Sequence, residues 1–184
     1  MKISKKGLSI ILILAVLVCS TAVIKIVSAQ SSEPTDAQIQ LVRETCLSLK
    51  TTINQLHASD ALLRVNMGEL YESISIKLMS GFNGRVANNN LNNNSLVTTT
   101  NSYNSLLDKF RADYQTYEEQ LSSAINIDCN NQPADFYTAV ALARTYRDQV
   151  HNDILGLNQA IDNYQSNLNQ FEQDYSLSLE GTTR

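Results

Sequence analysis

Glycine and proline are scarce in this sequence, which has 6 glycines and 2 prolines in 184 residues. The prolines are Pro34 and Pro133, and long stretches of the chain contain neither residue type. Both residue types interrupt helices, so their scarcity permits long ones. Apolar residues recur in these stretches at steps of three and four, which indicates helices rather than strands.

The sequence also lacks the motifs of common catalytic and metal sites. His-x-x-x-His, Glu-x-x-His, Cys-x-x-Cys and Gly-x-Ser-x-Gly are all absent, which argues against zinc, di-iron and nucleophile-elbow sites. The two histidines, His57 and His151, are expected at different levels of the fold, roughly 10 Å apart. We therefore predict no catalytic residues, no metal site, no cofactor and no enzymatic activity.

Basic residues are few outside the N-terminus. The first 29 residues hold four of the 14 basic residues and no acid, so the remainder carries 10 basic and 18 acidic side chains, a net charge of −8. Such a charge repels a phosphate backbone, and we predict no nucleic-acid binding. The acids Glu118 and Glu119, like Asp108 and Asp113, point in different directions on a helix, which predicts a solvated acidic face.

Residues 1–29 have the features of an export signal. Three lysines precede an apolar run over residues 7–24, and Val27-Ser28-Ala29 offers small residues at a signal-peptidase site. We expect cleavage after Ala29, which predicts a secreted or extracytoplasmic protein. The alternative is an uncleaved signal anchor that holds the protein on a membrane, because the run of 18 residues just reaches spanning length.

After a linker over residues 30–35, three segments show heptad spacing. The first is expected to form one helix over 36–80, with a seam at Ile39, Val42, Cys46, Leu49, Ile53, Leu56, Asp60, Leu63, Met67, Leu70, Ile74 and Lys77. The second seam is Tyr103, Leu107, Phe110, Tyr114, Tyr117, Leu121 and Ala124. The third is Phe136, Val140, Ala143, Arg147, Val150, Ile154, Leu157, Ile161, Tyr164, Leu168, Phe171 and Tyr175.

The segments between the seams set the expected topology. Residues 81–99 contain two glycines and the Asn-rich tract 88–94, a composition that predicts a flexible loop. The stretch 130–133 is typical of a tight turn. Three helices with these connections predict an all-α fold, an elongated up-down-up antiparallel three-helix coiled-coil bundle over 36–180. A four-helix bundle is the alternative if the first helix breaks near Ser59.

Two cysteines follow the expected cleavage site, Cys46 and Cys129, and an even number in an exported chain suggests one disulfide. If the first hairpin folds about residue 88, Cys46 lies level with residue 130, one step from Cys129. We therefore predict that the pair is joined across a loop of 83 residues. The alternative is two buried free thiols.

Charged residues interrupt the first and third seams. Counting residues along the helices places Asp60, Tyr114 and Arg147 at one layer of the bundle. We predict that Asp60 and Arg147 form a partly buried ion pair that fixes the register of the helices, rather than a catalytic centre. If the first helix instead breaks near Ser59, Asp60 is an ordinary cap and Arg147 extends outward.

Tyrosines recur at helical spacing, and such residues most often belong to the core, although a stripe of them can line a binding groove. Their positions are Tyr103, Tyr114, Tyr117, Tyr164 and Tyr175. We expect an exported coiled-coil structural or protein-interaction protein of the cell envelope or exterior, with a protein partner or self-association. The alternative is an extracytoplasmic binding module or inhibitor that captures a small ligand or an enzyme through the 81–99 loop or a tyrosine-lined groove.

Overall fold

The computed structural model describes residues 33–182, and every regular element among them is a helix. The elements are α2 (Asp36–Ser73), the π-helix η1 (Ile74–Ser80), α3 (Gly81–Asn88), α4 (Asn94–Asn126) and α5 (Pro133–Thr182). The predicted all-α bundle is confirmed. The predicted export signal over 1–29 lies outside the described residues.

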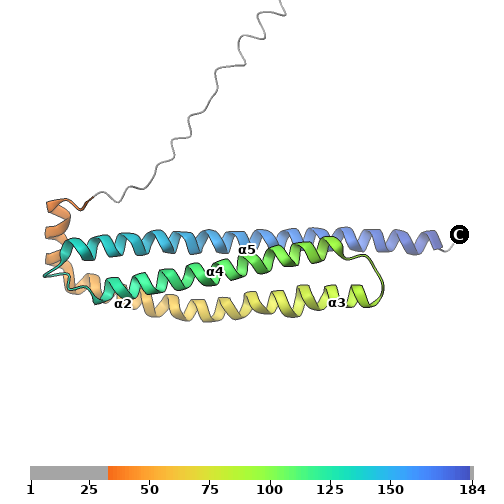
Figure 1. Cartoon of the computed structure of the whole chain (residues 1–184), viewed down its shortest axis with the longest axis horizontal. Coiled ribbons are helices and arrows are strands. Elements are labelled where there is room, and N and C mark those ends of the chain that lie inside the picture. Colours follow the sequence, from red (N-terminus) through yellow and green to blue (C-terminus); the bar gives the residue numbers. More distant parts are fainter. Residues whose placement is uncertain (1–32, 183–184) are drawn as a thin grey trace, which may run out of the picture. The chain divides into compact units, whose positions relative to one another are not determined.

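The elements α2, η1 and α3 run on as one rod that packs antiparallel to α4, and α4 packs antiparallel to α5 (Figure 1). The Tyr103 hydroxyl of α4 donates to the Tyr71 carbonyl of α2 at 3.0 Å, and Asn83 Nδ2 of α3 donates to Thr100 Oγ1 at 2.8 Å. Residue numbers therefore fall along α4 as they rise along α2 and α3. The same inverse order relates α4 to α5, in the contacts Thr99–Asn167, Lys109–Asp153 and Gln120–Ala139.

The first helix begins at a capping box and continues past Ser59. Thr35 Oγ1 accepts from the Gln38 amide, and Gln38 Oε1 accepts from the Thr35 amide, which satisfies backbone donors at the helix start. No break occurs near Ser59, so the four-helix alternative is wrong. The seam keeps one phase through this point, and tertiary packing of that seam keeps the helix continuous.

The π-helix η1 changes which residues face the core. Ser75 and Met79 are buried, whereas Lys77, the predicted seam position, is exposed. In a π-helix each amide bonds one residue further back than in an α-helix, which shifts the side chains around the axis. The predicted heptad phase is therefore wrong at Lys77, and the shift keeps a lysine out of the core.

The predicted flexible loop over 81–99 is wrong in extent, because α3 reaches Asn88 and α4 begins at Asn94. Asn83 is buried, and its side chain donates to Thr100 and accepts from the Tyr164 hydroxyl at 2.9 Å. Asn93 Nδ2 donates to the Asn83 carbonyl at 2.9 Å. Composition suggested disorder because asparagines bury poorly, but a satisfied polar network removes that cost.

The core follows the seam of α4. All seven predicted positions of this seam are buried: Tyr103, Leu107, Phe110, Tyr114, Tyr117, Leu121 and Ala124. The seam of α2 is covered less completely. Leu63 is 57% exposed and Leu70 is 50% exposed, although both were expected in the core. Leu63 borders a space beside α2, and this space belongs to the candidate site.

Candidate functional site

A groove runs between α2 and α5, with the aromatic seam of α4 at its base. It contains two cavities that share Tyr117 and Arg147 among their lining residues. We call them the central cavity, of about 260 Å³, and the N-terminal cavity, of about 340 Å³. The central cavity is lined from residues 60–67 of α2 and 147–154 of α5, and the N-terminal cavity from residues 38–56 and 136–147.

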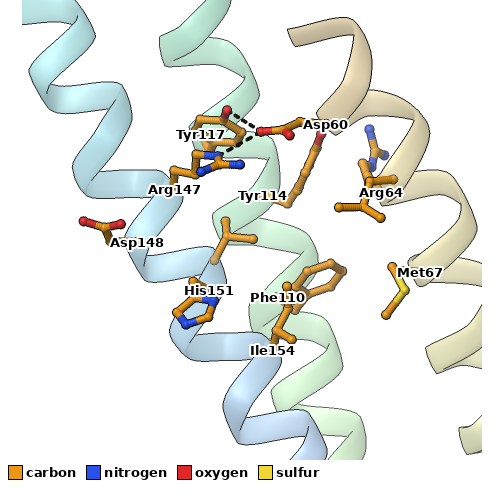
Figure 2. A pocket seen from close by; sticks show the side chains of 12 residues that line it. Asp60, Arg64, Met67, Phe110, Tyr114, Tyr117, Arg147, Asp148, His151 and Ile154 are labelled. Carbon is orange, nitrogen blue, oxygen red and sulfur yellow. Dashed lines mark hydrogen bonds and ion pairs between the residues drawn. The ribbon is translucent and has the colours of Figure 1, made fainter. Parts of the chain in front are cut away.

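The boundary between the two cavities is an ion pair across the groove (Figure 2). Asp60 Oδ2 accepts from Arg147 Nε at 3.0 Å and from the Tyr117 hydroxyl at 2.7 Å. The Asp60 side chain is 11% exposed, whereas that of Arg147 is 53% exposed. The structure therefore brings Asp60 and Arg147 into contact, and these bonds join α2, α4 and α5 at one point.

The tyrosine that binds Asp60 is Tyr117, one turn along α4 from Tyr114, which the sequence placed at this layer. Counting residues gives the level along the helix axis but not the reach of a long side chain. Tyr114 lines the central cavity, with the Arg64 guanidinium 5.2 Å from its ring centroid. It thus contributes a cation–π contact to the groove instead of a hydrogen bond to Asp60.

Burial and neighbouring charges shift the pKa values of the side chains around Asp60. Burial raises the pKa of Tyr117 well above its usual range, and its hydrogen bond to Asp60 adds to that shift. Burial also raises the pKa of Tyr114 to about 12. The bond to Asp60 raises the pKa of Arg147. Both tyrosines therefore stay neutral at physiological pH, and Arg147 stays charged, which suits a structural contact and a binding surface rather than proton transfer.

A disulfide links α2 to the α4–α5 turn, and a hydrogen bond links the start of α2 to the start of α5. Cys46 and Cys129 are joined, with their Cα atoms 5.6 Å apart. Gln38 Nε2 donates to the Tyr137 hydroxyl at 2.8 Å. Figure 1 shows the first turns of α2 crossing the end of the α4–α5 hairpin. The hydrogen bond joins the two walls of the N-terminal cavity, and the disulfide fixes α2 to the turn that precedes its α5 wall.

A buried carboxylate cluster lies on another face of α4 and α5, and the sequence did not reveal it. Asp153 is 6% exposed, and its Oδ1 accepts from Lys109 Nζ at 2.6 Å, while its Oδ2 is buried without a partner among the described residues. Lys109 also pairs with Asp113. Asp153 lies next to a seam position, and α5 buries more than one seam because it contacts both α2 and α4. The second buried seam of α5 does not appear as a separate repeat in the heptad pattern.

Burial raises the pKa of Asp153, whereas the hydrogen bond from Lys109 lowers the pKa of Asp113. The surroundings of the two carboxylates therefore shift their pKa values in opposite directions. Lys109 and Asp113 are both on α4 and Asp153 is on α5, so the Lys109–Asp153 ion pair links these two helices.

The histidines and the acidic pairs do not form a further site. His57 Nε2 lies 3.4 Å from Ser122 Oγ, and His151 lines the central cavity. Glu118 pairs with Arg64 at 3.1 Å. Among the described residues, no group of three His, Cys, Asp or Glu side chains is placed to hold a metal ion.

No helix within residues 33–182 combines the length and apolar character that a membrane crossing requires. The chain matches no protein-family model, and no characterised protein or solved structure is significantly similar to it.

Proposed function

We propose that this chain is a non-catalytic, exported interaction protein that binds through the groove between α2 and α5. The observation that carries the proposal is the groove, with walls that are mostly apolar and a base of buried tyrosines. Concave apolar surfaces with a few placed polar groups are the usual form of a binding site. The charged groups here are Asp60, Arg64, Arg144, Arg147 and Asp148.

Export is supported by the sequence of residues 1–29 and by the disulfide. Disulfides persist in oxidising compartments and are rare in the cytosol. The Cys46–Cys129 link closes a loop of 83 residues and holds the groove end together. An interaction protein outside the cell gains from such a link, because the walls of its binding surface then stay in place without a partner.

Site-specific photo-crosslinking in the native cells tests this proposal. Ala141 lines the N-terminal cavity, and its neighbour Leu142 does not line it and is 41% exposed. A small diazirine amino acid at Ala141 should give a discrete adduct with the occupant of the groove, and the same residue at Leu142 should not. Equal adducts from both positions, or none from Ala141, would contradict a binding role for the groove.

A structural spacer is the second candidate, and the length of α5 favours it. Fifty residues of continuous helix extend about 75 Å, and Figure 1 shows α5 running past the α3–α4 turn. A spacer that self-associates should elute as an oligomer in size-exclusion chromatography with light scattering. A monomer together with a groove-dependent adduct favours the interaction protein.

A further inference from the structure

The N-terminal cavity carries positive charge in a chain that is otherwise acidic. The sequence has 18 acidic and 14 basic residues, yet the residues that line this cavity include two arginines and no carboxylate. Arg144 forms no ion pair within the part of the chain that the structure describes. Arg147 pairs with Asp60 through its Nε. An occupant of this cavity is therefore selected for negative charge.

The positive charge of the cavity is concentrated at one end of its α5 wall. Arg144 and Arg147 are at one end of its α5 wall, and Phe136, Tyr137 and Val140 are at the other. At 1.5 Å per residue, this wall is roughly 15 Å long. The facing wall on α2 adds aliphatic side chains such as those of Val42, Leu49 and Ile53. The shape and polarity fit an elongated molecule with one anionic end.

The Asp60–Arg147 pair limits the length of such a molecule. Because this pair crosses the groove between the two cavities, a partner helix that followed the groove through both would have to break it. A single acyl chain fills the N-terminal cavity and stops before the pair. The cavity of about 340 Å³ is within the usual range for small-molecule sites, about 300–1,000 Å³.

We infer that the N-terminal cavity binds a single-chain anionic amphiphile of the free fatty acid class, with its carboxylate at Arg144 and its chain toward Tyr137. The inference rests on the proposed function, since it names the occupant of the same groove. The fatty acid desolvates the aliphatic walls, and the exposed Arg144 guanidinium receives the carboxylate, which stays close to water.

The test is a calorimetric titration with dodecanoate below its micelle concentration, using the protein as its own cells process it. Wild type should bind about one equivalent. Arg144→Gln should weaken binding by about tenfold or more, the usual value of a hydrogen bond to a charged group, and Arg85→Gln is the matched control on α3. Dodecan-1-ol should bind wild type more weakly than dodecanoate does, and Arg144→Gln should remove that difference. Ala141→Trp should abolish binding by filling the cavity, whereas Leu142→Trp should not.

Several outcomes would overturn the inference. If wild type and Arg144→Gln bind dodecanoate with equal affinity, Arg144 does not bind the carboxylate. Binding that survives Ala141→Trp places the ligand elsewhere, and binding only to vesicles of anionic phospholipid makes the ligand a membrane surface. No dodecanoate binding, together with a protein adduct from Ala141, overturns the fatty acid and leaves the proposed function standing. Failure of both the titration and the crosslinking overturns the two together.

Discussion

Removing either partner of the Asp60–Arg147 pair should destabilise the bundle, and the two losses should not add. Asp60→Ala leaves the buried Tyr117 hydroxyl without its acceptor, at a cost of about 1–3 kcal/mol. Arg147→Ala leaves Asp60 buried with Tyr117 as its remaining hydrogen-bond partner. Breaking a fully buried pair costs about 3–5 kcal/mol, but the Arg147 side chain is 53% exposed, so we expect about 2 kcal/mol. The destabilisation of the double variant should be about 1 kcal/mol smaller than the sum of the two single destabilisations.

The assay is urea unfolding followed by far-UV circular dichroism for the four proteins of the cycle. Arg85 provides the control, because it lies on α3 and contacts the Phe82 ring at 5.8 Å. Asp60→Ala combined with Arg85→Ala should be additive. If the Asp60 and Arg147 losses add within about 0.3 kcal/mol, the ion pair contributes nothing and the predicted register role is refuted.

Three further predictions concern other parts of the bundle. Non-reducing peptide mapping should recover Cys46 joined to Cys129, and Cys46→Ser should lower the free energy of unfolding by about 4 kcal/mol, given the long loop that is closed; two alkylatable thiols would contradict this. Amides over 83–88 and 96–100 should be protected in hydrogen exchange. Fast exchange across 81–99 would instead support the flexible loop that the composition predicts. In carboxyl NMR, Asp153 should titrate above its usual pKa and Asp113 below. Because the pKa of Asp153 is higher in the folded than in the unfolded protein, its contribution to stability falls as pH rises from the unfolded to the folded pKa. Across that pH range, the free energy of unfolding of Asp153→Asn should therefore increase relative to that of wild type.

Much of this fold can be predicted from the heptad pattern because long helices have a constant rise. The seam of α4 is buried as expected, and counting residues along antiparallel helices brings Cys46 to Cys129 and Asp60 to Arg147. The same counting misplaced the tyrosine by one turn, because it ignores side-chain reach. It also failed at Lys77, since no residue pattern marks the change to π-helical hydrogen bonds.

The groove itself could not be predicted from the sequence. A heptad seam such as that of Leu63 and Leu70 predicts burial, but it does not say how closely α2 approaches α5. The buried network of Asn83 was missed for a related reason, because its partners Thr100 and Tyr164 are distant in sequence. Asparagine composition alone cannot distinguish such a network from a flexible loop.

Hydrogen exchange of the protein with and without an occupant shows whether the groove between α2 and α5 is the binding surface. The occupant is dodecanoate or the partner recovered by crosslinking from Ala141. Binding in the groove should slow exchange over 38–56 and 136–147, the two walls of the N-terminal cavity. Exchange over 101–109 of α4, which lines neither cavity, should stay unchanged. Protection over 101–109 with none along the two walls would place the binding surface outside the groove.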